Sequence, residues 1–247
     1  MPRTDPADHP AVIELRQYTL RPGRRDELID LFDREFVETQ EGTGTIVLGQ
    51  FRDLDDPDRF VWLRGFTDME VRREALSAFY GGPVWAVHGP QANATMVDSD
   101  NVLLLRPLPA GSGFAVTPSD RPQEEAAAAP DRFVACALWH FPPGRHNGIE
   151  LIWDGLVPVL RETGPAPLAV LTTEPAANTF PRLPVRTGEN VVAVFTSYPD
   201  ESAHRRHLTR AMAHPLVRKE LLPDIEQAQT AAPELLRLAP TARSLIR

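Results

Sequence analysis

The sequence predicts an α+β fold made of two similar halves, each with strands and helices in the order βαββαβ. A strand, a Pro-Gly turn and an amphipathic helix at residues 12–36 return in altered form after residue 133. Apolar strands at 60–66 and 191–197 occupy matching places in the two halves. The closing segments NVLLLRP (101–107) and ELLRLAP (234–240) also resemble each other. Repetition of this kind indicates one supersecondary unit that occurs twice.

The first strand is identified by alternation, because Ile13 and Leu15 alternate with Glu14 and Arg16 at the strand period of two. The turn at 22–23 ends this strand, since proline lacks an N–H and glycine tolerates positive φ. The turn at 143–144 lies 121 residues later in the chain. The same interval aligns the apolar faces of the two following helices, Leu28, Leu31, Phe32 and Phe36 with Ile149, Ile152, Trp153 and Val157.

The other elements follow from apolar runs bounded by turn residues. Further strands are expected at 45–52, 60–66 and 101–106, with a helix ending at 81–82 and a short helix starting at Pro83. In the second half, strands are expected at 165–173, 191–197 and 234–238, and helices at 201–213 and after Pro215. The strand at 191–197 is apolar on both faces, so we expect it to be central and covered on both sides.

These elements divide the chain into a flexible tail (1–10), a first ferredoxin-like domain (11–107), a linker (108–131) and a diverged second domain (132–247). The linker is rich in Pro, Gly, Ser and Ala, with little to bury. A βαββαβ sheet has helices on one face only, and its bare apolar face needs a cover. We therefore expect the two sheets to face each other in a closed α+β barrel, with a pocket or a packed core inside.

Composition excludes several classes of protein. The 247 residues carry a net charge of −8 with no basic cluster, which argues against nucleic-acid binding. A single cysteine excludes an intrachain disulfide. No apolar run approaches the roughly 18 residues of a membrane span. We expect a cytoplasmic protein with a small hydrophobic molecule as its partner, and a homodimer is compatible with the sequence.

Four stretches resemble a NIPSNAP-type domain, a family of the dimeric α+β barrel superfamily: IELRQYTLRPGRRDEL, FVWLRGF, YGGPVWAVHG and ANATMVDSDNVLLLRP. The resemblance covers roughly residues 12–107 and is weaker over 133–240, where YGGPVW is replaced by MAHPLV. It implies tandem ferredoxin-like repeats packed as a dimeric α+β barrel type fold. The superfamily includes haem-degrading monooxygenases, cofactor-free quinone-forming oxygenases and polyketide cyclases, so the resemblance leaves the reaction open.

Large amphipathic rings are candidates for a substrate pocket. Tyr18, Trp62, Trp85 and Trp139 would hold a flat aromatic or polyketide-like ligand, and Tyr18 and Trp139 lie at equivalent positions of the two halves. The alternative is that these rings fill the core under the helices.

Polar candidates follow Trp85 in the chain. His88 would act as general base, while Asn93 and Thr95 would hydrogen-bond a ligand carbonyl or phenolate. The alternative is a surface or capping His88 and a turn residue at Asn93. His140 would face a second pocket. We expect no cofactor, with haem on His140 as the less favoured reading.

Three further groups have structural interpretations. His204, His207 and His214 have metal-ligand spacing, but the arginines between the first two favour a solvated face, and we expect no metal site. Cys136 is expected to point at the helices. Glu14 and Arg16 are expected to point into the barrel, as a ligand clamp or as an ion pair.

Two functions remain open. The first is a small-molecule enzyme, a cofactor-independent oxygenase or cyclase, acting on an aromatic or polyketide-like substrate in a cavity lined by Tyr18, Trp62, Trp85 and His88. The second is a non-catalytic ligand-binding or protein-interaction module, which a packed barrel without a cavity would favour.

Overall fold

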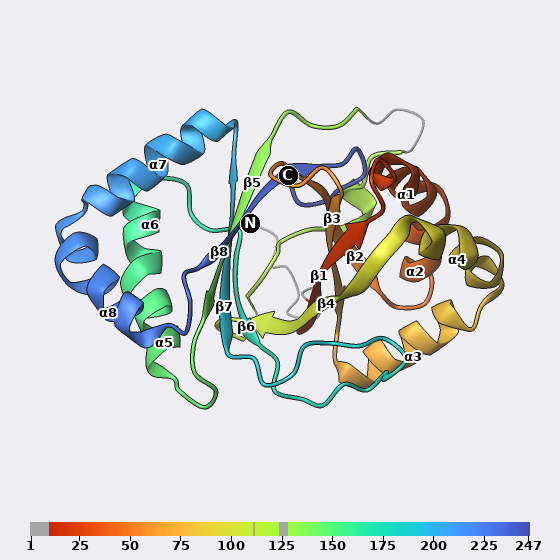
Figure 1. Cartoon of the computed structure of the whole chain (residues 1–247), viewed down its shortest axis with the longest axis horizontal. Coiled ribbons are helices and arrows are strands. Elements are labelled where there is room, and N and C mark those ends of the chain that lie inside the picture. The colour runs from red at the N-terminus through yellow and green to blue at the C-terminus, as the bar shows by residue number, and fades with distance from the viewer. Residues whose placement is uncertain (1–9, 111, 124–127) are drawn as a thin grey trace.

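In the computed structural model, which describes residues 10–110, 112–123 and 128–247, eight strands close into a single barrel with helices on two opposite sides (Figure 1). The order around the barrel is β1-β3-β2-β8-β5-β7-β6-β4. Residues 1–9 of the expected tail, and residues 111 and 124–127 of the expected linker, lie outside the described residues. The strands are β1 (Val12–Leu20), β2 (Ile46–Asp53), β3 (Arg59–Phe66), β4 (Met96–Pro107), β5 (Phe133–His140), β6 (Ala169–Thr173), β7 (Val191–Tyr198) and β8 (Glu234–Pro240).

Each half has the expected βαββαβ order, and each helical connection is made of two or three consecutive segments. Helices α1 to α4 lie on one side of the barrel and α5 to α8 on the other (Figure 1). The first half contains α1 (Arg25–Leu31), the π-helical η2 (Phe32–Phe36), α2 (Val37–Glu41), α3 (Met69–Tyr80) and α4 (Pro83–Thr95). The second half contains α5 (Asn147–Glu150), the π-helical η5 (Leu151–Leu156), α6 (Val157–Thr163), α7 (Glu201–Ala213), the π-helical η6 (Val217–Leu221) and α8 (Leu222–Ala228).

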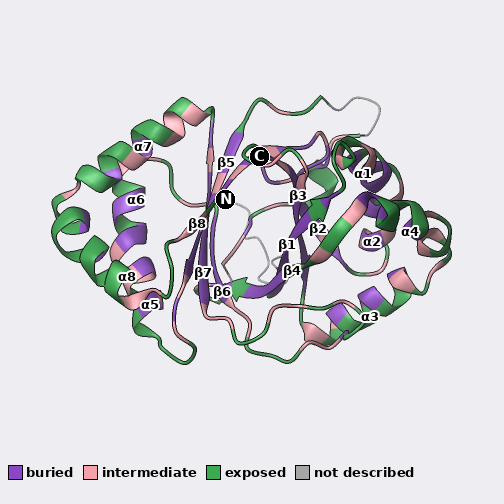
Figure 2. Cartoon of the chain, in the orientation of Figure 1, coloured by how far each residue is buried: buried purple, intermediate pink, exposed green. Residues whose placement is uncertain are grey.

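The two four-stranded sheets join edge to edge. Strand β2 pairs with β8 from Phe51↔Pro240 to Asp53↔Leu238. On the other side, β4 pairs with β6 from Leu105↔Thr173 to Pro107↔Leu171. These two short seams close the barrel, which is expected because each sheet has one face without helices. As expected, β7 is central, since it lies between β5 and β6 and is buried along almost its whole length (Figure 2).

The barrel interior is packed with apolar side chains. One cluster of buried residues draws on all eight strands, including Ile13 and Leu15 of β1 and Cys136 of β5. The expected orientations of Glu14, Arg16 and Cys136 are therefore wrong: Cys136 points into the barrel, and the two charged residues face the helices. Alternation along a strand separates two faces but does not say which one is enclosed, and here both are buried.

The segment that joins the halves is packed more tightly than its composition indicates. Phe114 is 1% exposed inside the barrel, 5.2 Å from the ring of Phe195. Arg121 is buried as well and donates to the Arg243 carbonyl at 2.6 Å. A 3-10 turn, η3 (Pro118–Asp120), precedes it. The described part of this segment thus contributes to the core.

Several elements differ in length from the prediction, among them α4, β4 and β6, which starts at Ala169 rather than at residue 165. Helix α4 runs for 13 residues to Thr95, so β4 starts at Met96 rather than at residue 101. Within the described ranges, no helix combines the length and the apolar character that crossing a membrane requires.

Candidate functional site

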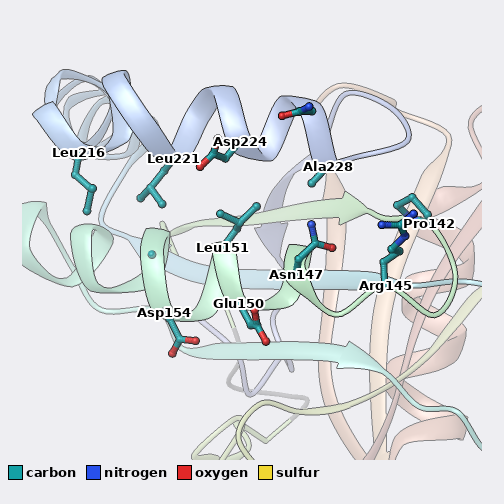
Figure 3. A pocket seen from close by; sticks show the side chains of 12 residues that line it. Pro142, Arg145, Asn147, Glu150, Leu151, Asp154, Leu216, Leu221, Asp224 and Ala228 are labelled. Atoms are coloured by element: carbon teal, nitrogen blue, oxygen red, sulfur yellow. The ribbon is translucent and has the colours of Figure 1, made fainter.

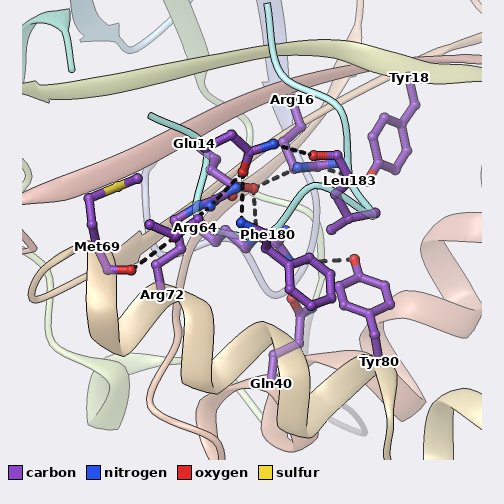
Figure 4. A network of polar contacts seen from close by, with 12 residues as sticks. Glu14, Arg16, Tyr18, Gln40, Arg64, Met69, Arg72, Tyr80, Phe180 and Leu183 are labelled. Carbon is purple, nitrogen blue, oxygen red and sulfur yellow. Dashed lines mark hydrogen bonds and ion pairs between the residues drawn. The ribbon is translucent and has the colours of Figure 1, made fainter. Parts of the chain in front are cut away.

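A buried cluster of charges lies on the outer face of the first sheet, beneath the helices (Figure 4). The Glu14 carboxylate contacts three guanidinium groups, those of Arg16 at 2.6 Å, Arg64 at 2.8 Å and Arg72 at 2.6 Å. All four side chains are at most 1% exposed. An ionised network this deeply buried is costly to desolvate, and it persists only where its charges are paired and hydrogen-bonded.

Three elements bring these side chains together. Glu14 and Arg16 are two residues apart on β1 and share a face, and Arg64 lies directly opposite Glu14 on β3. Arg72 comes from α3. This helix starts at Met69 because the Asp68 carboxylate accepts the backbone N–H groups of Glu70 and Val71 at 2.8 and 2.7 Å. One turn later the helix points Arg72 at the sheet.

The cluster has more positive than negative charge. Burial alone would raise the pKa of Glu14, but the charges of Arg64, Arg16 and Arg72 outweigh it and hold that pKa well below the ordinary range. Burial lowers the pKa of Arg72, and the like charges of Arg64 and Arg16 act in the same direction. Three cations and one anion leave a formal excess of two positive charges. Arg64 Nη2 and Arg72 Nη2 are buried without a hydrogen-bond partner among the described residues.

Next to the cluster, a small aromatic cavity lies between the sheet and the helices. It encloses about 20 Å³. The Tyr18 and Trp62 rings meet edge to face at 5.9 Å, and the rings of Tyr80 and Trp85 are 4.6 Å apart. A cavity of this volume holds about one water molecule, so a larger ligand requires the surrounding helices to move. The lining residues are Tyr18, Leu28, Phe32, Phe36, Gln40, Trp62, Phe79, Tyr80, Trp85, Ala92 and Met96.

Charges and rings are in contact. The Arg16 guanidinium carbon is 5.3 Å from the Tyr18 ring centroid, and its Nε donates to the Tyr18 hydroxyl at 2.8 Å. The Arg64 guanidinium carbon is 5.1 Å from the Trp62 ring, and Arg64 Nη1 donates to Gln40 Oε1 at 3.0 Å. The cavity therefore has largely aromatic walls, and the cationic cluster lies beside the Tyr18 and Trp62 rings that line it. A cationic cluster next to an aromatic cavity favours a planar ligand that carries or develops negative charge.

Of the residues predicted from sequence, three meet in this cavity: Tyr18, Trp62 and Trp85. Thr95 is buried close by, but its hydroxyl donates to the Ala92 carbonyl at 2.7 Å and closes the end of α4. The alternative interpretation, that these rings fill the core, also applies in part, since Tyr18 and Trp62 belong to the apolar cluster under the first-half helices.

The other predicted residues lie elsewhere. His88 is 30% exposed on α4, with Nε2 3.4 Å from Glu35 Oε2, and Asn93 is exposed on the same helix. Neither lines the cavity. Trp139 packs in the core of the second half, and His140 Nδ1 lies 3.3 Å from Glu189 Oε2. The roles proposed for these residues stay predictions.

Sequence reasoning missed Arg64, Arg72, Gln40 and Tyr80. Two signals were available. Arg64 shares a strand face with Trp62 inside the apolar run FVWLRGF, and Arg72 precedes Leu76 and Phe79 by four and seven residues on the buried face of α3. A charge at a core-facing position indicates a partner or a ligand, because burying it alone is prohibitive.

The first half of the chain matches a known family. Residues 13–110 match the model of the NIPSNAP family. They form a NIPSNAP domain. Among curated proteins, none matches the sequence.

Solved structures match the fold of nearly the whole chain. A candidate monooxygenase of Fusobacterium nucleatum is 11% identical with a TM-score of 0.58, and the match covers 95% of this chain and 94% of that one. A candidate monooxygenase of Lactobacillus acidophilus is 13% identical with a TM-score of 0.52, and the match covers 94% of both chains. An anthrone oxidase-like protein is 13% identical with a TM-score of 0.60, and the match covers 98% of this chain and 96% of that one. At these identities the likeness establishes the ferredoxin-like α+β barrel fold and nothing finer.

Among the described residues of the second half, no counterpart of the charged cluster is found. Its helices cover an aliphatic core that includes Ile152, Val157 and Val192. On its surface, an open groove of about 910 Å³ runs between the α5–η5 and η6–α8 segments (Figure 3). Arg145, Glu150, Asp154 and Asp224 line this groove and give it both signs of charge. It therefore lacks the aromatic walls and the adjoining cationic cluster of the cavity in the NIPSNAP domain.

The three histidines with metal-ligand spacing make structural contacts. His204 stacks on Phe133 at 4.9 Å, and the buried His207 bonds the Tyr198 hydroxyl through Nδ1 at 2.8 Å. His214 Nε2 lies 3.9 Å from Glu162. Over the described ranges, no group of three or more His, Cys, Asp or Glu is arranged to hold a metal ion.

Proposed function

We propose that the NIPSNAP domain binds a flat hydrophobic aromatic or polyketide-like molecule between its sheet and its helices, and oxidises it with molecular oxygen without a bound cofactor. The observation that carries this proposal is the aromatic cavity of Tyr18, Trp62 and Trp85 at the edge of a buried cluster with excess positive charge. The fold shared with two candidate monooxygenases and an anthrone oxidase-like protein supports it.

The charge excess suggests how such a substrate would be activated. Guanidinium groups at the cavity edge lower the pKa of a phenol or enol bound beside them, because they stabilise the anion. The electron-rich anion then reacts with oxygen. In the overall change a ring CH2 group becomes C=O, one oxygen atom enters the product, and the other leaves as water with the two hydrogens. Exclusion of water by the aromatic walls would keep the anion reactive.

The small volume of the cavity requires movement for binding. We propose that α4 moves outward, since it carries Trp85 and follows the Gly81-Gly82 pair that separates it from α3. A ligand would take the space between Trp85 and the sheet.

The test measures oxygen uptake and quinone absorbance with a hydroxylated anthrone as substrate. We expect Arg64→Gln to lower kcat by about 100-fold, the size of a lost electrostatic contact to a developing anion. His88→Ala tests the predicted general base, and unchanged turnover would remove His88 from the mechanism. A lack of oxygen uptake with anthrones and naphthols, despite their binding, would overturn the oxidation and leave cyclisation of a polyketide-like chain as the second reaction of this site.

A non-catalytic binding or interaction module is the second candidate function. The packed barrel interior and the 20 Å³ volume of the cavity favour it. Binding without turnover of any tested substrate would support this alternative. We also propose that the two halves are diverged copies of one unit, and that the working site belongs to the first copy.

A further inference from the structure

A segment of the second half crosses over the charged cluster of the NIPSNAP domain. We call residues 174–190, which connect β6 to β7, the strap. Arg72 Nη1 donates to Asn178 Oδ1 at 3.0 Å and to Thr179 Oγ1 at 3.3 Å. The Phe180 ring of the strap stacks on Tyr80, with centroids 5.9 Å apart and planes at 26°. The strap thus covers both the cationic cluster and one wall of the aromatic cavity (Figure 4).

The covered cluster has unused donors that point to a ligand. Arg64 and Arg72 are fully buried, yet each has an Nη2 group without a partner among the described residues. A buried donor with no acceptor keeps the full cost of its desolvation, and this cost is larger for a charged group. Two such groups, in a cluster with two uncompensated positive charges, are expensive to keep for stability alone. An anionic ligand would remove both costs.

We infer that Arg64 and Arg72 form a binding site for an anionic oxygen group of the ligand, a carboxylate or a phenolate, which the neutral oxygens of the strap mask. This inference rests on the proposed function for the location of the ligand, and it adds the ligand's charge. Guanidinium forks match the geometry of a carboxylate, and their bonds to anionic oxygens are about twice as strong as those to neutral ones. An anion therefore displaces the amide of Asn178 and the hydroxyl of Thr179 from Arg72.

In its middle the strap is held by side-chain hydrogen bonds, such as that from Thr179 Oγ1 to the Met69 carbonyl at 3.0 Å, and the exchange would have to break them. Its ends are fastened to β4 by backbone hydrogen bonds, from Glu174 N to the Leu104 carbonyl and from Arg186 N to the Val102 carbonyl, both at 2.9 Å. Between these points it spans a cavity of about 300 Å³, whose lining includes Asn178 and Val185. The middle of the strap can shift into this space while the barrel strands stay paired.

The test compares two planar probes of nearly equal shape, the anionic 2-naphthoate and the neutral 2-naphthamide. Binding to the full chain is measured by calorimetry and by the tryptophan fluorescence that Trp62 and Trp85 contribute beside the site. We expect 2-naphthoate to bind at least about tenfold more tightly. Arg72→Gln should weaken the binding of 2-naphthoate by about tenfold and the binding of 2-naphthamide by less than about twofold, because only the anion loses a charge-assisted hydrogen bond.

Two further variants control for folding. Arg73→Gln changes the neighbouring arginine of α3, which is exposed and pairs with Glu70, and should leave both probes unchanged. Asn178→Ala removes the competing acceptor and should tighten 2-naphthoate about threefold without tightening 2-naphthamide. A loss of stability cannot produce this gain.

The outcomes separate the two proposals. Equal binding of the two probes, no binding of 2-naphthoate, or a proportional loss of both in Arg72→Gln would overturn the anion site. A clear preference for 2-naphthoate in a protein that takes up no oxygen with anthrones would overturn the oxidation and leave the anion site standing.

Discussion

The two sheets of the barrel have the same register and opposite chemistry on their outer faces. Glu14 lies opposite Arg64 in the first sheet, and the equivalent pair in the second is Ala135 opposite Thr196. On the inner faces both sheets contribute the same kind of apolar side chain to one cluster. The apolar interior faces of both halves therefore close the barrel. The outer face of the first half also carries ionised groups, which are not needed to close it.

The outer face of the second sheet shows which polar contacts suffice when a sheet only packs against its helices. One buried polar chain lies beneath its helices, in which the Tyr198 hydroxyl meets His207 Nδ1 at 2.8 Å and His207 Nε2 donates to the Leu160 carbonyl at 3.0 Å. Burial lowers the pKa of His207, which favours the neutral ring. Every polar atom of this imidazole is satisfied, so no ligand is needed. The unsatisfied guanidiniums of the first half differ in this respect.

The largest effect is expected when the carboxylate is removed from the charged face. Glu14→Gln should destabilise the protein by about 3–5 kcal/mol, because three buried cations lose their only anion in the cluster. Urea unfolding measures the change. Glu70→Gln on the surface of α3 is the control, and it should change stability far less than Glu14→Gln.

The stability difference between Glu14→Gln and the unmodified protein should depend on pH, because the pKa of Glu14 is lowered in the folded state. Its contribution is fully present above the unfolded glutamate pKa of about 4.3 and is lost as the pH falls through the lower folded value. The gap between Glu14→Gln and the unmodified protein should stay constant from about pH 8 to pH 5 and close only in stronger acid. A gap that already closes near neutral pH would contradict the paired state of Glu14.

A second comparison uses equivalent aspartates. Burial raises the pKa of Asp33, a residue of η2, to about 7, while the equivalent Asp154 of η5 is exposed. The folded state therefore holds a proton on Asp33 that the unfolded chain releases near pH 4, so stability falls as the pH rises from about 4 to 7. Asp33→Asn should stabilise the protein at about pH 8 by about 1–3 kcal/mol, and keep the bond from Gln50 Nε2.

Denaturation midpoints at several pH values check this effect. The advantage of Asp33→Asn should vanish near pH 4, where both states of the unmodified protein are protonated. Asp154→Asn should change stability by less than about 0.5 kcal/mol at every pH. An equal response of the two variants would mean that Asp33 is solvated in the folded protein.

The smallest expected effect on stability compares a charged hydrogen bond in the first half with a neutral one in the second. Tyr18→Phe removes the acceptor of Arg16 Nε and should cost about 1–2 kcal/mol, since the donor that loses its partner is charged and buried. Tyr198→Phe leaves a neutral imidazole nitrogen and should cost about 0.5–1 kcal/mol. Urea unfolding of both variants under the same conditions measures the two losses of stability. A larger loss of stability for Tyr198→Phe than for Tyr18→Phe would contradict this expectation.

The order of elements could be predicted because it depends on local signals, such as the Pro-Gly turns at 22–23 and 143–144 and the alternation around Ile13. The π-helical turns η2 and η5 carry no such signal, and their presence in both halves ties them to the fold. The direction of Glu14 could not be predicted, because both faces of its strand are buried. The strap could not be predicted either, since Arg72 and Asn178 meet across 106 positions of sequence.

Closure of the barrel by two short seams has a consequence for how the protein folds. The edges of β2 and β4 find their partners only in β8 and β6, which come late in the chain. During synthesis the first sheet therefore stands with both edges open and one apolar face uncovered, a state prone to aggregation. Once the second sheet docks, covalent linkage keeps the two together at any dilution, which separate subunits could not achieve.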